Sequence, residues 1–469
     1  MKKKYYIPYM LFGLMMISVS SCYVSKKYQR PSMATSNLFR TDQLMDSASL
    51  VMDSISMAEV SWQNFFSDDL LKGYIQQGLD SNLDIRIALK NIDAAAAFVK
   101  QGKAAYEPTL TGSLTYSHIR NSKSSKIPQR DVDNFGLGVN ASYEPDIWGK
   151  IHSQDKAFVA AYLQTVEAHN AVKSRLIASI ATLYYQLMAV DNQVAIAKQS
   201  ILSRDSSLQT TKALMQSGQL TAVAVKQTEA QLYEAQLLLL SLQQQKRIFE
   251  NAFCLLLNQP AHAVVRNSLA DQEVTTPLRL GVTSALLANR PDVRQAEFVL
   301  INAFELTNMA KSNFYPSLTI TAGTGFQSAD IEKWVGLNAI FANVAGGLVQ
   351  PILNRRQIKT AYEVAKAKQA QALFNYQKIL LVAGNDVSNA LFDYQTEVQS
   401  IDIIEREYTA LRTAVDYSNQ LLLNGLANYL EVLTARQSAL MAELNLVNAR
   451  LGHLIAVVDL YQALGGGWR

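Results

Sequence analysis

The sequence contains the same unit twice, at a spacing of 208 residues. Residues 104–111 (AAYEPTLT) match residues 312–319 (SNFYPSLT), and this spacing separates the prolines of the two segments. Gly218 and Gly425 keep nearly the same spacing, 207 residues. Solenoid repeats are much shorter, about 20–50 residues. A unit of this length is therefore half of a fold, and we expect two similar halves that pack together with pseudo-symmetry.

The composition allows a large core and gives no sign of nucleic-acid binding. Of the 469 residues, 49% are hydrophobic and 17% are charged. Length alone would allow several domains, but the repeat predicts one body with its first half at 62–275 and its second half at 276–469. The net charge of +4 is small for this length. No block of Lys and Arg alternates with aromatic residues, as a nucleic-acid surface would require.

The N-terminus has the pattern of a bacterial lipoprotein signal. Three lysines, Lys2–Lys4, precede an apolar run, Ile7–Ile17, and small residues directly precede Cys22. This order is typical of a cleaved secretory signal. We expect residues 1–21 to be a signal peptide and Cys22 to become the acylated, palmitate-bearing N-terminus. An ordinary signal peptide that happens to contain a cysteine is the alternative.

The rest of the chain gives Cys22 no other evident purpose. The second cysteine, Cys254, lies in a predicted helix, which leaves Cys22 no evident disulfide partner. We expect residues 22–61 to form an extended, lipid-anchored segment. No later stretch reaches the roughly 18 uninterrupted apolar residues of a membrane helix, so a membrane would have to be crossed by strands.

Two alternating runs predict a strand hairpin at about 109–145. In Leu110–Ser117 the hydroxyl-bearing residues fall on one face and the large apolar residues on the other. Phe135–Tyr143 alternates in the same way, with glycines and polar residues on one face. Each run is about 10 residues long, the length that a tilted membrane strand needs. A polar loop, His118–Asp133, is expected between them.

The second half repeats this pattern at about 317–350. Leu318, Ile320 and Phe326 alternate with threonines and glycines, whereas the return strand within Gly336–Gln350 alternates less clearly. Alternation alone fits an ordinary half-buried hairpin on a soluble core equally well. Four strands cannot close a barrel, which needs about eight, and an open edge cannot lie in lipid. If the hairpins enter a membrane, two, three or four chains must share one barrel.

Long helices account for most of the remaining sequence. Four segments contain no proline and hardly any glycine: Trp148–Met215, Leu220–Leu257, Asn354–Leu423 and Asn428–Leu464. About 65 helical residues span roughly 100 Å, so such helices need neighbours along their whole length. Gly218 and Gly425 lie at the breaks and are expected to cap the turns at the helix tips.

Five motifs in order along the mature chain carry a family resemblance. They are WQNFFSD at Trp62–Asp68, SYEPDIWG at Ser142–Gly149, LLANRPDVR at Leu286–Arg294, GLANYLEVL at Gly425–Leu433 and LYQALGGGW at Leu460–Trp468. Together they resemble the TolC-like outer-membrane efflux proteins. Within that family, the chain resembles the lipoprotein subgroup that serves RND-type pumps, also called OprM-like or NodT-like.

This resemblance implies a mostly α fold with a membrane β-barrel portion. Each chain of a homotrimer would give four strands to a twelve-stranded barrel and its long helices to a periplasmic helical barrel. The implied function is an exit duct in outer-membrane lipid that conducts drugs or other small solutes passively. Its implied partners are a periplasmic adaptor protein and an inner-membrane RND-type transporter. The resemblance implies no cofactor beyond the covalent lipid on Cys22.

The resemblance also implies a gate at the periplasmic helix tips. In this family, inward-facing helices with acidic side chains close the tunnel, and a ring of like carboxylates favours cations. The matching segment offers Glu431, and it has Thr434 where relatives often carry Asp. The first half offers Ala224 and Gln227 at the equivalent places, so any acidic ring is thinner here. A solvated helix charge is the alternative interpretation of Glu431.

No motif indicates catalysis or metal binding. The five histidines are scattered without metal-ligand spacing, and no phosphate loop or nucleophile elbow occurs. We therefore expect that the protein is not an enzyme. Two other functions stay open: a TolC-type channel for ABC-driven secretion of proteins or peptides, and a coiled-coil structural lipoprotein without a pore. The alternating strands count against the second, because a rod needs no glycine-rich polar strand face.

Overall fold

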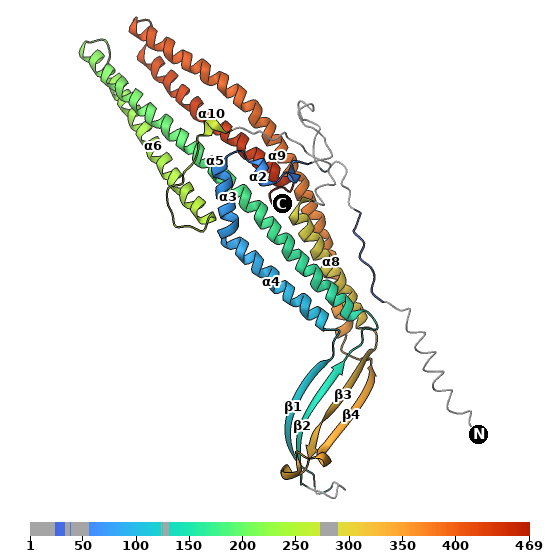
Figure 1. Ribbon diagram of the computed structural model, residues 1–469. Helices are drawn as coiled ribbons and strands as arrows, with labels where there is room; N and C mark the ends of the chain where they lie inside the picture. Colours follow the sequence, from blue (N-terminus) through green and yellow to red (C-terminus); the bar gives the residue numbers. More distant parts are fainter. Residues whose placement is uncertain (1–23, 33–37, 39–55, 123, 125–130, 273–288) are drawn as a thin grey trace. The chain divides into compact units, whose positions relative to one another are not determined.

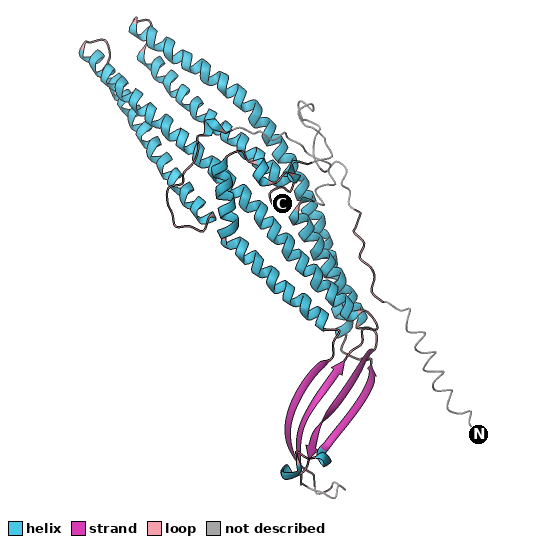
Figure 2. Cartoon of the chain, in the orientation of Figure 1, coloured by secondary structure: helices cyan, strands magenta, loops and turns pink. Residues whose placement is uncertain are grey.

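The chain is described from a computed structural model that defines residues 24–32, 38, 56–122, 124, 131–272 and 289–469. The expected signal peptide and Cys22 lie outside these residues. Within the described ranges, long helices and a four-stranded sheet account for most of the chain (Figure 1, Figure 2).

The two halves of the sequence form the same series of elements. Both series contain a 22-residue helix, a strand hairpin, a 67-residue helix and a 35-residue helix. The first series consists of α4 (Leu83–Ala104), β1 (Thr109–Arg120), β2 (Asp131–Tyr143), α5 (Lys150–Gln216) and α6 (Ala222–Leu256). The second series consists of α8 (Pro291–Ser312), β3 (Ser317–Ser328), β4 (Ile340–Val349), α9 (Gln357–Leu423) and α10 (Tyr429–Ala463). The duplication seen in the sequence is therefore also present in the three-dimensional structure.

Short elements complete the described chain. Before α4 lie η2 (Met57–Glu59), α2 (Trp62–Phe65) and α3 (Asp69–Ser81), and η3 (Leu269–Asp271) follows α6. The loop between β3 and β4 contains η5 (Ile331–Lys333) and η6 (Leu337–Ala339). None of the described helices is long and apolar enough to cross a membrane.

The long helices begin and end where local chemistry dictates. The Asp146 carboxylate accepts hydrogen bonds from the backbone N–H groups of Ile151 (3.0 Å) and His152 (2.8 Å), which otherwise lack partners at the start of α5. No proline interrupts the 67 residues that follow, so the backbone ladder runs on for about 100 Å.

The sheet is antiparallel, has the strand order β1-β2-β3-β4 and separates apolar from polar side chains. Leu114 lies opposite Leu137, Leu137 opposite Phe326 and Phe326 opposite Ile340. Residues directly opposite each other share a face, so one apolar row crosses all four strands. On the other face the equivalent row is Thr111, Asn140, Gly323 and Asn343. The expected alternation is confirmed.

The first hairpin is longer than expected. The predicted loop His118–Asp133 is wrong at both ends, because 118–120 continue β1 and 131–133 begin β2. His118 pairs with Asp133 and Arg120 with Asp131. The His118 ring lies 2.9 Å from the Asp133 carboxylate. Polar residues at a strand end are typical of a loop, but polar pairs across two strands, including the ion pair of Arg120 with Asp131, support the ladder instead.

The chain divides into two compact units, and each takes residues from both sequence halves. Unit 1 comprises Met1–Ser32, Asn91–Thr165 and Ala296–Tyr376 and contains the sheet. Unit 2 comprises Met33–Lys90, Val166–Gln295 and Gln377–Arg469 and contains both long-helix turns. The sequence halves are thus repeats of structure without being separate packing units.

The core of unit 2 explains the first sequence motif. The Asp68 carboxylate accepts hydrogen bonds from Leu70 N and Leu71 N at the start of α3 and from the Tyr184 hydroxyl of α5 (3.0 Å). Phe65 stacks on Tyr461 near the end of α10, with ring centroids 3.9 Å apart. Tyr184 itself is fully buried. This motif therefore joins the N-terminal helices to the motif at Leu460–Trp468.

The start of α8 is fixed by Arg290–Asp292 of the LLANRPDVR motif. The helix begins at Pro291 with Asp292 in its first turn, the arrangement expected of a helix N-terminus. Arg290 is buried and bridges Asp292 (2.7 Å) and Asp386 of α9 (2.9 Å). It also donates to the Ala463 carbonyl at the end of α10 (3.1 Å). One side chain therefore connects three helices.

Candidate functional site

The two long-helix turns of unit 2 are built alike. Gly218 follows α5 with φ +75° and Gly425 follows α9 with φ +70°. Backbone hydrogen bonds close both turns, from Gln219 N to Leu214 O and from Leu426 N to Leu421 O, each 2.9 Å. This is the Schellman pattern, in which the left-handed residue is usually glycine. Both glycines therefore occupy turns that other residues would strain. Figure 1 shows the two turns at one end of the unit.

The helices that return from these turns begin with side-chain caps. The Thr221 hydroxyl accepts from Ala224 N (3.4 Å) at the start of α6. The Asn428 side chain accepts from Glu431 N (3.2 Å) at the start of α10. Thr and Asn are both favoured at this position. The cap places Glu431 in the first turn of α10, where the helix dipole favours a negative charge.

Glu431 and Thr434 lie on the same exposed face of α10. Residues three apart are neighbours on a helix surface, and both side chains are exposed whereas Val432 and Leu433 between them are buried. The Thr434 hydroxyl donates to the Leu430 carbonyl (2.9 Å). The structure thus brings together the two residues that the sequence singled out. Their contribution to a gate stays a prediction.

Of the two equivalent positions in the first half, Gln227 is exposed, as Thr434 is, but Ala224 has a different environment from Glu431. Ala224, which corresponds to Glu431, is buried and packs with Tyr429 and Leu433 of α10. The Thr228 hydroxyl of α6 lies 2.8 Å from the Tyr429 hydroxyl. The two helix hairpins therefore pack against each other through Ala224 and Thr228 of α6 and through Tyr429 and Leu433 of α10. Repeated elements have acquired different neighbours here.

A buried arginine, which the sequence did not single out, joins three helices near the turns. Arg204 of α5 is 6% exposed. Its guanidinium donates to the Gln231 carbonyl of α6 (2.8 Å) and to the Gln437 side chain of α10 (2.5 Å). Burial lowers the pKa of Arg204 from its ordinary value. Both of these partners are neutral oxygens, so the charge is held by directed hydrogen bonds.

Arg436 makes the reciprocal connection from α10. Its guanidinium donates to the Ser207 hydroxyl of α5 and to the Asn419 side chain of α9 (2.8 Å). With Arg204, it ties α10 to the other three long helices of the unit. We call these two arginines and their partners the arginine latch. Single arginines in a polar helix usually point to solvent, so no signal in the sequence distinguished them.

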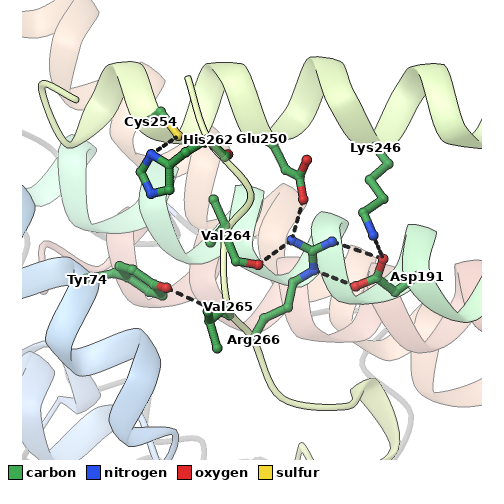
Figure 3. A network of polar contacts seen from close by, with 9 residues as sticks. All are labelled: Tyr74, Asp191, Lys246, Glu250, Cys254, His262, Val264, Val265 and Arg266. Atoms are coloured by element: carbon green, nitrogen blue, oxygen red, sulfur yellow. Dashed lines mark hydrogen bonds and ion pairs between the residues drawn. The ribbon is translucent and has the colours of Figure 1, made fainter. Parts of the chain in front are cut away.

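A second polar network holds the segment that follows α6 (Figure 3). Arg266 forms two hydrogen bonds to Asp191 (2.5 and 2.9 Å) and one to Glu250 (3.0 Å). Lys246 also pairs with Asp191 (2.9 Å). Burial alone would raise the pKa of Asp191, but hydrogen bonds from Arg266 and Lys246 hold it below its ordinary value. The network fastens this segment to α5 and α6.

A cysteine of α6 also contacts the segment that follows the helix. Cys254 is a free, fully buried cysteine whose Sγ lies 3.4 Å from His262 Nδ1. In the parts of the chain that the structure describes, no group of three or more His, Cys, Asp or Glu side chains is placed to hold a metal ion.

Comparison with known proteins identifies the class. The family model for outer membrane efflux proteins matches residues 74–259 and 282–466, most of the chain and both halves of the repeat. The cation efflux system protein CusC of Escherichia coli O157:H7 is 26% identical over 97% of each chain. The probable outer membrane lipoprotein SilC of Salmonella typhimurium is 24% identical over 98% of this chain and all of its own.

The solved structures show the same fold. The outer-membrane channel OprN superimposes with a TM-score of 0.88 at 22% identity, covering 95% of this chain and all of OprN. The chain therefore belongs to the outer membrane efflux protein family. It is an outer-membrane channel of efflux pumps and not an enzyme. The family, fold class and location expected from the sequence are confirmed.

Proposed function

We propose that three copies of this chain form the outer-membrane exit duct of a tripartite pump. An inner-membrane RND-type transporter would supply the energy, and a periplasmic adaptor would join it to the helical tips. The duct itself would conduct drugs, cations or other small solutes passively. The observation that carries this proposal is the two-faced sheet, because its chemistry fits lipid on one side and an aqueous lumen on the other.

The apolar face of the sheet needs surroundings that a single chain does not give it. Leu110, Leu114 and Val344 are 73%, 70% and 79% exposed. Apolar patches of this extent mark a contact surface with a protein or a membrane. The opposite face carries hydroxyls, carboxamides and glycines, as the interior of a water-filled membrane barrel does. Lipid outside and water inside would satisfy both faces.

The sheet edges supply the argument for several copies. β1 and β4 are the edge strands of the four-stranded sheet, and lipid tolerates no open edge. Pairing β4 of one copy with β1 of the next would close a ring. Three copies give twelve strands, the number that the family resemblance implies.

Exposed apolar residues on the helices support the same arrangement. α4 exposes Leu83, Ile87 and Phe98, and α9 exposes Phe374 and Leu381. These two helices adjoin the edge strands β1 and β4 in the chain. Copies joined at the sheet edges would bring α4 of one copy beside α9 of the next. This contact would cover the exposed apolar residues of both helices.

The segment after Cys22 supports the proposed lipid anchor and its location. We call residues 24–32 the strap, because they lie extended along α8. The Asn308 side chain exchanges two hydrogen bonds with the backbone of Lys26, and Arg30 forms an ion pair with Glu297 (2.6 Å). Lys311 donates to the Val24 carbonyl (3.5 Å). Val24 therefore lies at the end of α8 that leads into β3.

Two membrane-seeking features would then meet at one end of unit 1. Cys22 is only two residues before Val24, so an acyl chain on Cys22 would enter lipid beside the strands. The relative SilC bears the name of an outer membrane lipoprotein. We propose that Cys22 carries the lipid.

At the long-helix turns of unit 2, we propose that Glu431 from three copies forms a carboxylate ring. Thr434, one turn further on the same face, adds only hydroxyls. A single carboxylate ring favours cations less strongly than the double ring of relatives with Asp at the second place. The arginine latch would hold α10 in the closed position.

Single-channel recording of the full-length lipoprotein in planar bilayers, with its mass in detergent, tests this function. We expect a particle of three chains that conducts. In a salt gradient, Glu431→Gln should lower the cation-to-anion permeability ratio, and Thr434→Asp should raise it. A monomer without conductance would contradict the duct, whereas a conducting trimer with unchanged selectivity in both variants would contradict only the ring.

A further inference from the structure

A groove between α8 and α9 is not used by the proposed duct mechanism. It lies within unit 1 and has a volume of about 760 Å³. Pockets that accept small organic molecules have volumes of roughly 300–1,000 Å³. We call it the α8/α9 groove. Its size therefore suits an organic molecule rather than a single ion.

The lining of the groove is apolar with a polar margin. Val299, Leu306 and Met309 from α8 face Val364 and Ala365 from α9. Carboxamides of Asn302, Asn313, Gln371 and Asn375 complete the lining. Apolar walls with a few polar groups are typical of sites for small organic ligands.

One charge selects the kind of ligand. Lys368 is exposed and carries the only formal charge among the described residues that line the groove. None of these described lining residues is a carboxylate that could neutralise it. An anionic group on an otherwise apolar molecule would complement this arrangement, whereas a cation would be repelled.

The strap and the groove lie on different faces of α8. Phe304 and Asn308 contact strap residues Tyr28 and Lys26. Leu306 and Ala310, which line the groove, follow those contact residues by two positions. Two positions correspond to about 200° around a helix, so the groove lies on the face of α8 opposite the strap.

The groove would therefore face the lumen if the proposed function holds. An acylated Cys22 can reach lipid only from the outside of the duct, which puts the strap on the outer surface and the groove on the inner wall. We infer that the α8/α9 groove is a transient binding site for amphipathic organic anions on the inner wall of the duct. This inference rests on the proposed trimeric duct. Such a site must bind weakly, because conduction requires release.

The test uses the full-length lipoprotein in phosphatidylcholine nanodiscs and two fluorescent probes with similar aromatic bodies. Anilinonaphthalene sulfonate is anionic and N-phenylnaphthylamine is uncharged. Lys368→Gln should weaken sulfonate binding about three- to fivefold, as expected for one exposed charge pair, and leave the uncharged probe unaffected. The loss should shrink at high salt because salt screens the charge.

A second variant fills the groove without touching the charge. Ala361 lines the groove and is exposed, so Ala361→Phe should fold and should weaken both probes at least tenfold. The matched control on α9 is Lys359→Gln, which lies outside the lining. It should bind the two probes as the wild type does.

Channel recording separates the outcomes. Sulfonate should cause brief current blockades in the wild type and in Lys359→Gln but not in Ala361→Phe. A conducting trimer in which Lys368→Gln and Ala361→Phe bind both probes normally would overturn the site and leave the duct intact. Altered binding without blockades would overturn the inner-wall location. A protein that forms no conducting trimer would overturn the proposed function and this site together.

Discussion

At the scale of single residues, Arg266 shows how one side chain fixes an irregular segment. It lies after α6 and has 5% of its side chain exposed, and it binds Asp191, Glu250 and the Val264 carbonyl. A buried guanidinium needs several oxygen partners to offset its lost hydration. The segment from α6 to η3 is therefore held by directed bonds instead of a regular backbone ladder.

This network predicts a pH dependence of stability. The pKa of Asp191 is lower in the folded protein than in the unfolded chain, so its stabilising contribution is present above the unfolded pKa of about 3.9 and is lost as the pH falls through the lower folded value. Asp191→Asn should lower the unfolding midpoint at neutral pH, and the difference from wild type should shrink in acid. Thermal unfolding followed by circular dichroism measures both.

The matched control is Asp69→Asn, because Asp69 is an exposed carboxylate in α3 with 94% of its side chain accessible. It should change the unfolding midpoint little at any pH. A difference between wild type and Asp191→Asn that stays constant down to pH values well below 3.9 would contradict the assigned pKa direction.

The helix turns give a second prediction at this scale. Gly425 has φ +70° and open space where the methyl group of an alanine would lie, so Gly425→Ala adds backbone strain without a clash. We expect a loss of about 1 kcal/mol in unfolding free energy.

Gly73→Ala is the control. Gly73 lies inside α3 with equally open space, so alanine there should stabilise the protein by about 0.5–1 kcal/mol. Denaturant titration measures the change in unfolding free energy of each variant. Changes of the same sign in both variants would contradict the strain assigned to Gly425.

At the scale of elements, α10 is held by contacts that differ from those of its repeat partner α6. Tyr429 and Leu433 pack against Ala224 of α6, and the arginine latch reaches α5, α6 and α9. The latch bonds are polar and few and lie near the N-terminal end of α10, whereas most of the apolar residues that α10 buries, such as Leu446, Leu454 and Leu460, lie further along the helix. A change of position is therefore easiest for the N-terminal part of α10.

Removing Arg436 should favour the open duct. Arg436→Ala deletes two hydrogen bonds, each worth about 0.5–1.5 kcal/mol. The ratio of open to closed states should rise about tenfold, which single-channel open probability measures. Arg406→Ala is the control, because Arg406 pairs with Asp402 one turn away in the same helix. Equal open probabilities in wild type and Arg436→Ala would contradict the latch.

At the scale of the whole molecule, the proposed assembly assigns opposite surroundings to adjacent residues of β4. Val344 lies on the apolar face and Ala345 on the polar face. Val344→Lys should destabilise the membrane-inserted trimer by about 2–4 kcal/mol, whereas Ala345→Lys should be tolerated in a water-filled lumen. Trimer yield from outer membranes and its heat resistance in detergent compare the two variants. Equal yields would contradict the assignment of the faces.

Much of the fold was predictable because its signals are local or periodic. Alternation in Leu110–Ser117 predicted β1, and the absence of proline predicted α5 and α9 within a few residues of their observed bounds. The loop predicted at His118–Asp133 was too long, because a polar strand end looks like a loop until its partner strand is known. Of the candidate gate, Glu431 and Thr434 were found from a motif, and Arg204 and Arg436 were missed.

The sequence by itself determined the duplication, the helix lengths, the two faces of the hairpins and the family. Each depends on residues that are near in the chain or that recur with a fixed period. Only the tertiary structure decided that Arg204 meets Gln437, 233 residues away, that Ala224 is buried where Glu431 is exposed, and that a groove lies opposite the strap. Those contacts depend on how helices distant in the sequence pack together, and two copies of one sequence pattern do not reveal which faces will meet.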